Sequence, residues 1–201
     1  MLTVQNAPVS LDAYVPYLSP ATIGLHLKLH NSYVEKVNAH LAKRGLDTHD
    51  ALSAVKIAER SGDIDFIHAA QQVVNHDFYW SGFHTYAQPE SNVYELADAV
   101  GDSKAHALIT EIAGRGSGIF GSGWVWMVFR RGGIEVDSAP NSELTWMINP
   151  ATPLLCVDVW EHAYLLDYGS SRDDYLSLIL AHVVDWSVVA HRLRLCGRKS
   201  A

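Results

Sequence analysis

The feature that most constrains the fold is a short apolar run at residues 154–159, which follows two prolines and holds one carboxylate, Asp158. Aliphatic and β-branched residues are typical of a buried strand, and the polar residues Glu161 and His162 after it predict a turn. An Asp near a strand end and a His four residues later can converge on one point. Their anionic oxygen and neutral nitrogen suit a transition metal ion, but such a pair is also typical of a simple hydrogen bond or a helix cap.

More metal-ligand residue types lie on a long helix that we expect between Ser19, a favourable N-cap, and Gly45, a typical C-terminal stop. His26, His30 and Tyr33 are spaced by four and three residues and therefore share one stripe of that helix. A single His on a helix is most often an ordinary polar residue. Three such side chains on one inner face are harder to explain in that way.

A further His lies on the helix predicted for residues 66–83, which follows a helix expected at 47–60 and a break at Gly62. Gln72 and His76 are four residues apart and so share one helix face, and bulky aromatic residues follow them. A buried helix whose His is satisfied by a backbone carbonyl is the ordinary explanation of this pattern.

The C-terminal half contains two more strand patterns, at residues 124–129 and 134–136, separated by the turn residues Arg131-Gly132-Gly133. Together with the run at 154–159 they predict a three-stranded antiparallel sheet. Helical periodicity is present at residues 89–112, which three glycines then follow, and again at 173–195, which predicts a final helix against the sheet.

These elements predict an α+β fold with two domains. We expect an N-terminal helical hairpin domain at residues 1–90 and a C-terminal domain at residues 91–201, in which helices pack on the three-stranded antiparallel sheet.

Composition narrows the class of protein. The chain has 201 residues, of which 48% are hydrophobic, enough for one compact unit or two small domains. No segment approaches the roughly 20 apolar residues of a membrane span, and the start lacks the features of a signal peptide, so we expect a soluble, cytoplasmic protein. The formal net charge of −7 argues against nucleic-acid binding, and two cysteines provide no disulfide framework.

Four segments resemble motifs of the manganese/iron superoxide dismutase family. Residues 158–168, DVWEHAYLLDY, are similar to the signature D-x-W-E-H-A-Y-Y-x-D-Y, and residues 69–80 resemble the motif that carries the second His ligand. Residues 120–128, FGSGWVWMV, are similar to F-G-S-G-W-x-W-L-V, and residues 26–34 resemble the first-ligand helix with one residue fewer before its Tyr. The resemblance implies a mononuclear metal site whose ligands are His26, His76, Asp158 and His162.

The resemblance also implies roles for residues around the metal. Tyr33 and His30 match a catalytic relay beside the substrate channel, Gln72 matches an amide that tunes the metal, and Trp124 and Trp160 match residues that line the pocket. Iron-type members carry the Gln four residues before the second His ligand, as here. We therefore expect iron, or less favourably manganese, with one ion per subunit.

The family resemblance implies an antioxidant oxidoreductase that converts superoxide anion to oxygen and hydrogen peroxide. Glu161 and Tyr164 match residues that reach across a subunit interface, so a homodimer, or a tetramer of such dimers, is implied. On a chain whose overall charge is negative, Lys28 and Arg172 are the candidates for guiding the anion to the site.

Three other functions are compatible with the same residues. Two of the histidines with Asp158 match a facial triad for other mononuclear iron chemistry with oxygen, and the shortened first-helix motif favours this slightly. The chain also fits a non-catalytic scaffold, because a fold does not guarantee an activity, or a metal store. A complete ligand set argues against the scaffold.

Overall fold

The computed structural model describes residues 1–2, 10–88 and 90–198. The helices are α1 (Pro20–Lys43), α2 (Ala51–Ser61), α3 (Ile64–Trp80), α4 (Tyr94–Val100), α5 (Asp102–Gly118), α6 (Thr145–Ile148), the 3₁₀ helix η1 (Glu161–Ala163), α7 (Leu165–Tyr168), α8 (Arg172–His182) and α9 (Trp186–Arg198). The strands are β1 (Gly123–Arg130), β2 (Gly133–Pro140) and β3 (Thr152–Asp158).

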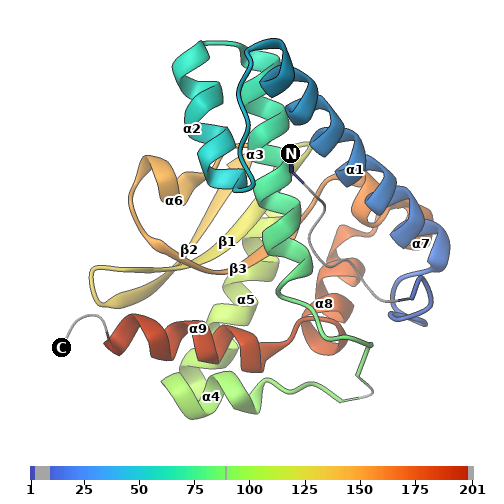
Figure 1. Cartoon of the computed structure of the whole chain (residues 1–201). Helices are drawn as coiled ribbons and strands as arrows, with labels where there is room; N and C mark the ends of the chain where they lie inside the picture. The colour runs from blue at the N-terminus through green and yellow to red at the C-terminus, as the bar shows by residue number, and fades with distance from the viewer. Residues whose placement is uncertain (3–9, 89, 199–201) are drawn as a thin grey trace.

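The N-terminal part is a hairpin of long helices in which α1 packs against α3 and α2 packs against α3 (Figure 1). Local capping sets where these helices begin. The Ser19 side chain accepts a hydrogen bond from the Thr22 backbone N at 3.2 Å, and Asp63 Oδ1 accepts one from the Phe66 backbone N at 3.2 Å. Gly62 ends α2 in the left-handed conformation, with φ of 67°, which confirms the predicted break.

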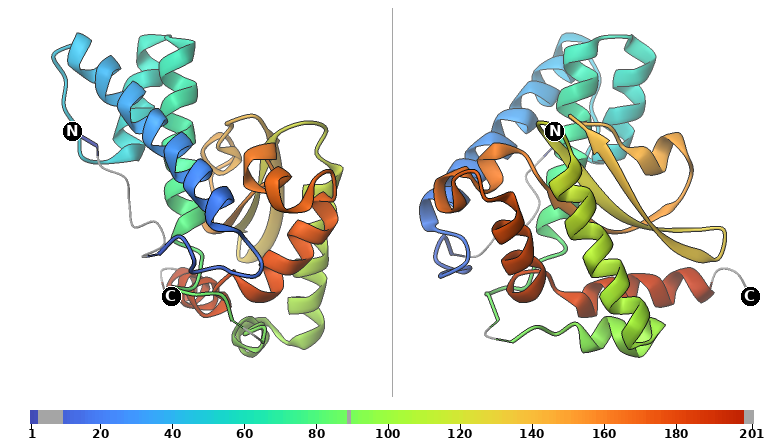
Figure 2. Two further views of the ribbon diagram at one scale, coloured as in Figure 1. Left: turned by 90° about the vertical axis from the view of Figure 1, so that its right-hand side faces the viewer. Right: turned by 180° about the vertical axis from the view of Figure 1, so that it is seen from behind.

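The sheet has the strand order β2-β1-β3, and both pairings are antiparallel, as predicted. The two-residue loop Arg131-Gly132 joins β1 to β2 with positive φ angles of 52° and 82°, which suits a tight hairpin turn. The sheet lies between α3 on one side and α5 on the other (Figure 2). In the β1–β3 register Trp124 pairs with Asp158, so the end of the sheet delivers both side chains to the same region.

Two long helical predictions are wrong in detail. The stretch predicted at 89–112 is two helices, because Gly101 adopts a φ of 89° between α4 and α5, and α5 continues through the glycines to Gly118. The single final helix predicted at 173–195 is divided into α8 and α9. Its break at residues 183–185 is made by hydrogen bonds from His84 N to Val183 O and from Asp185 N to Gly82 O, both 2.9 Å long.

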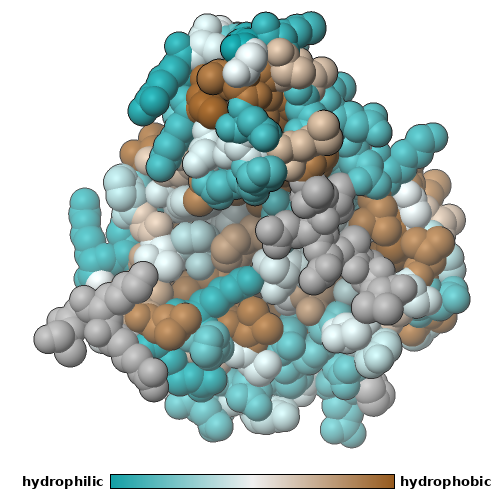
Figure 3. Space-filling view, viewed as in Figure 1, coloured by the Kyte–Doolittle hydropathy of each residue, from teal (hydrophilic) through white to brown (hydrophobic). Residues whose placement is uncertain are grey.

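The predicted fold class is confirmed, with a helical hairpin followed by a sheet packed with helices. The boundary near residue 90 stays a prediction. The interior is rich in buried aromatic residues, among them Trp124, Trp126, Trp186 and Tyr175. Figure 3 shows one face of the surface as mostly hydrophilic with separate hydrophobic areas. Within the described ranges, no helix is both long enough and apolar enough to cross a membrane.

Candidate metal centre

Four side chains from four elements converge at the junction of the hairpin and the sheet. His26 comes from α1, His76 from α3, Asp158 from the end of β3 and His162 from η1. One ligand atom from each lies within 4.8 Å of the others. Asp158 Oδ2 is 3.1 Å from both His26 Nε2 and His162 Nε2. The structure therefore brings together all four predicted ligands.

Hydrogen bonds outside the cluster orient its ligand atoms. His76 Nδ1 lies 2.7 Å from the Gln72 carbonyl oxygen, which can only accept, so Nδ1 is the donor and Nε2 is left to face the cluster. Asp158 Oδ1 accepts from the Trp160 backbone N at 2.7 Å, which directs Oδ2 inward. Such partners fix the ring orientation and the tautomer of a metal-binding His.

The donor set fits a transition metal ion. His76 Nε2 is a buried nitrogen atom that has no hydrogen-bond partner among the described residues, and His26 Nε2 faces only the carboxylate of Asp158. Leaving such atoms unpaired is costly, and a bound cation removes that cost. Three imidazole nitrogens and one carboxylate oxygen suit Fe, Mn and similar ions, whereas Mg²⁺ and Ca²⁺ prefer oxygen alone.

Electrostatics keep the cluster ready to bind a cation. Burial lowers the pKa of His26 to about 4 and the pKa of His76 well below its ordinary value, so both rings are neutral at neutral pH. Burial by itself would raise the pKa of the Asp158 carboxyl, but His162 and His26 outweigh it and hold that pKa below its ordinary value. The carboxylate is therefore ionised.

Gln72 is held beside the cluster by a directional network of hydrogen bonds. Its Oε1 accepts from Trp124 Nε1 at 3.1 Å and from Asn75 Nδ2 at 3.3 Å. Because an indole N–H is only a donor, these bonds fix the amide with its oxygen towards Trp124 and its NH₂ group elsewhere. Asn75 Nδ2 also donates to the Ser142 carbonyl at 3.1 Å. Trp124 itself is buried, with its ring 5.0 Å from that of His76.

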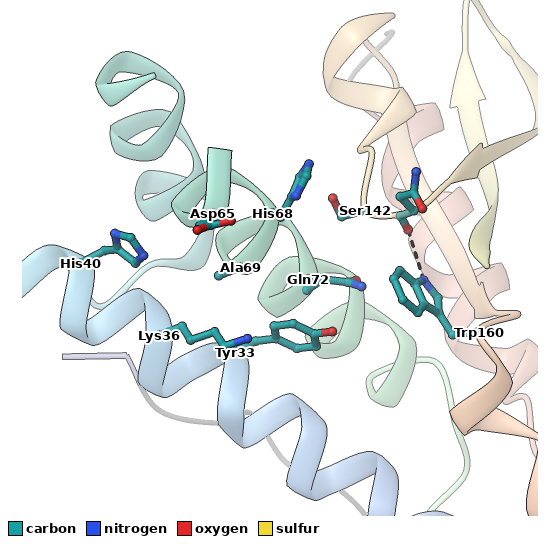
Figure 4. A pocket seen from close by; sticks show the side chains of 10 residues that line it. Tyr33, Lys36, His40, Asp65, His68, Ala69, Gln72, Ser142 and Trp160 are labelled. Carbon is teal, nitrogen blue, oxygen red and sulfur yellow. Dashed lines mark hydrogen bonds between the residues drawn. The ribbon is translucent and has the colours of Figure 1, made fainter. Parts of the chain in front are cut away.

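A cavity of about 680 Å³ opens beside the cluster, walled partly by α1 and α3 (Figure 4). Tyr33, Gln72 and Trp160 line it at the end near the cluster, where the Tyr33 ring is 5.6 Å from the His76 ring. Burial raises the pKa of Tyr33, the charge of Asp158 adds to this, and a hydrogen bond with Gln72 opposes it. Trp160 Nε1 donates to the Asn141 carbonyl at 3.1 Å.

His30 does not have the channel position expected for it. It is fully buried and is not among the residues that line the cavity. Its Nε2 instead lies 3.2 Å from Asp77 Oδ1, and its ring stacks on His76 at 5.0 Å. Because α1 is a regular α-helix throughout, His30 lies four residues after His26 on the same face of the helix, and it is therefore buried beside the ligand cluster. A relay that includes His30 stays a prediction.

The two residues expected to guide an anion are not at the cavity. Lys28 is exposed on α1, two residues from His26 and so about 200° around the helix from it. Arg172 bonds inward, to the carbonyl oxygens of Ile119 at 2.7 Å and Gly121 at 2.6 Å. It also donates to Tyr164 Oη at 3.1 Å. Their role in guiding an anion stays a prediction.

The residues expected at a subunit interface differ in exposure. Glu161 is exposed beside His162, whereas Tyr164 is only 5% exposed and packs its ring 5.5 Å from Tyr175. Their role between subunits stays a prediction.

Sequence reasoning missed three residues of this site. Asn75 lies inside the segment that resembles the second-ligand motif and is three residues from Gln72, a spacing that places both on one helix face. Asp77 follows His76 directly, but nothing in the pattern pointed to His30 as its neighbour. Lys36 lines the cavity three residues beyond Tyr33, and its helical spacing was the available signal.

Comparison with known proteins assigns the family. Residues 2–84 match the α-hairpin domain of the iron/manganese superoxide dismutases, and residues 95–192 match their C-terminal domain. The chain is 34% identical to an iron superoxide dismutase of Synechocystis sp., with 94% of this chain and 96% of that protein covered. It is 32% identical to a manganese superoxide dismutase of Rhizobium meliloti, covering 92% of each. A Mn/Fe superoxide dismutase of Rickettsia typhi is 30% identical, covering 94% of this chain and 91% of that protein. The chain therefore belongs to the iron/manganese superoxide dismutases, a family of oxidoreductases.

Proposed function

We propose that the protein catalyses the dismutation of superoxide with one iron ion held by His26, His76, Asp158 and His162. The observation that carries this is the convergence of one ligand atom from each residue within 4.8 Å in a buried site. A bound iron or manganese ion supplies the one-electron redox couple that the reaction needs. The comparisons add no support for a different iron chemistry or for a scaffold role.

The charges of the ligands favour an anionic substrate. His26 and His76 are neutral because burial lowers the pKa of each. Asp158 contributes one negative charge, which is less than the charge of a divalent or trivalent ion. The loaded site therefore keeps a positive charge, which attracts superoxide.

Tyr33 and Gln72 are placed to serve the protons of the reaction. One superoxide gives up an electron and leaves as oxygen, and a second takes up one electron and two protons and leaves as hydrogen peroxide. The raised pKa of Tyr33 keeps its Oη–H protonated at neutral pH, at the cavity wall. Gln72 offers its NH₂ group on the side away from Trp124, where it contacts Tyr33. These two side chains hold a proton and orient the substrate.

Iron is favoured because Gln72 arises from α3, the arrangement that resembles iron-type members. The test is to prepare metal-free protein, load it with iron or with manganese to equal occupancy, and measure superoxide consumption. We expect the iron form to be at least tenfold more active. Equal activity of the two forms, or a more active manganese form, would contradict the preference and leave the dismutase function standing.

The homodimer is supported by exposed residues near the site. Glu161 is exposed next to His162, and Phe120 is 100% exposed. Phe120 and Glu161 lie in segments that Arg172 connects, because its guanidinium donates hydrogen bonds to both Gly121 O and Tyr164 Oη. A second copy that covers Phe120 would remove its large apolar surface from water.

Sedimentation velocity tests the dimer. Wild type is expected to sediment as a dimer and Phe120→Glu as a monomer, whereas Tyr94→Glu, which changes another exposed aromatic residue, is the matched control. A monomeric wild type at micromolar concentration would contradict the proposal.

A further inference from the structure

The cavity beside the metal centre has an asymmetric arrangement of charge that the family resemblance did not indicate. Among its lining residues in the described ranges, Lys36 is the only lysine or arginine. It lies on α1, one helical turn beyond Tyr33 and on the same side (Figure 4). Its Nζ lies 5.4 Å from the centroid of the Tyr33 ring, within the range of a cation–π contact.

The basic side chains His40 and Arg44, at or near this cavity, are already paired with Asp63, and His68 is exposed in the same lining. The His40 ring lies 3.2 Å from Asp63, and Arg44 also pairs with Asp63 at 2.8 Å. Asp65 lines the same cavity and adds a negative charge. Lys36 is therefore the one lysine or arginine that brings a positive charge to the described lining of this cavity.

We propose that Lys36 is the residue that draws the anionic substrate into the cavity and past Tyr33, in place of Lys28 and Arg172. The proposal rests on the proposed function, because it names the guide for that reaction's substrate. The protein as a whole carries a formal charge of −7 and repels anions at long range. A cation at the mouth of a cavity with low-dielectric walls focuses the local field and raises the rate at which an anion enters.

Charge-changing variants with a matched control test this. Lys36→Gln removes the charge, and Lys28→Gln removes an equal charge from the same helix, eight residues away and outside the cavity lining. We expect Lys36→Gln to lower kcat/KM for superoxide about two- to fivefold at low salt and to flatten its dependence on ionic strength. Lys28→Gln is expected to match wild type. Asp65→Asn, which removes a negative charge from the cavity, is expected to raise kcat/KM about twofold.

A second measurement separates this proposal from the proposed function. Azide, a small monovalent anion, is titrated into the iron-loaded protein and followed by optical absorption. We expect Lys36→Gln to weaken azide binding about two- to fivefold and Lys28→Gln to leave it unchanged. If Lys36→Gln weakens azide binding but the wild-type protein does not consume superoxide, Lys36 attracts anions as proposed and the dismutase function is refuted. Equal azide affinity and equal salt dependence of Lys36→Gln and wild type would overturn the role of Lys36.

Discussion

Replacing Gln72 by Leu tests whether the amide network holds the metal centre as described. Leu removes the acceptor of Trp124 Nε1, a buried donor that then has no acceptor at its 3.1 Å position. An unsatisfied buried donor costs about 1–3 kcal/mol. Asn75 keeps its 3.1 Å bond to the Ser142 carbonyl and loses only the weaker bond to Gln72, which costs about 0.5–1.5 kcal/mol. The buried apolar side chain of Leu offsets this loss by about 1 kcal/mol through the hydrophobic effect.

The balance is a loss of about 2 kcal/mol in the free energy of unfolding. It is measured by urea unfolding of the metal-free protein, so that metal binding does not contribute. A double-mutant cycle isolates the Trp124 term, because Trp124→Phe removes the donor. We expect Gln72→Leu to cost about 1–2 kcal/mol less in the Trp124→Phe background than in wild type. Equal costs in both backgrounds would refute the hydrogen-bond reasoning.

Three further predictions concern pH, packing and capping. The pKa of His26 is about 4 when folded and 6.5 when unfolded, so the unfolded chain binds more protons between these values. His26 alone should therefore make the metal-free protein lose up to about 3 kcal/mol of stability as pH falls from about 6.5 towards 4, and the lowered pKa of His76 adds a loss of the same sign; urea unfolding across that range checks this. Gly123→Ala should destabilise by about 2 kcal/mol or more, since its Cβ would lie 2.3 Å from Ala139 O; thermal unfolding measures this, and an unchanged midpoint would contradict it. Asp50→Ala removes the cap of Ser53 N and should cost about 1 kcal/mol by the same assay, whereas no change would show that water replaces the cap.

Local signals in the sequence were enough to predict the hairpin and the sheet, and the family resemblance implied the ligand set. Capping residues and glycines marked where α1, α2 and α3 begin or end, and alternating apolar runs marked the strands. The four ligands were predicted because their motifs are specific, and the structure brings them together.

Features that depend on tertiary contacts could not be predicted in this way. Apolar periodicity continues through residues 183–184, and the bonds of this segment to residues 82 and 84 hold the break between α8 and α9, where Asp185 Oδ1 also accepts from the Ser187 backbone N at 3.0 Å. Lys36 was missed although its spacing from Tyr33 places both on one side of α1, because that pattern does not show which residues of this side line the cavity. The position of His30 depended on Asp77, which contacts it from another helix.

Metal content and superoxide consumption, measured on the same purified sample for wild type, His76→Ala and His191→Ala, test the four-ligand dismutase site most directly. His191 is exposed on α9, outside the ligand cluster and the cavity lining, so it is the matched control. Circular dichroism verifies that each variant is folded. We expect superoxide consumption in proportion to bound iron in wild type and His191→Ala, and the loss of both in His76→Ala. One equivalent of iron without superoxide consumption, or full activity in folded His76→Ala, would contradict the proposed dismutase site.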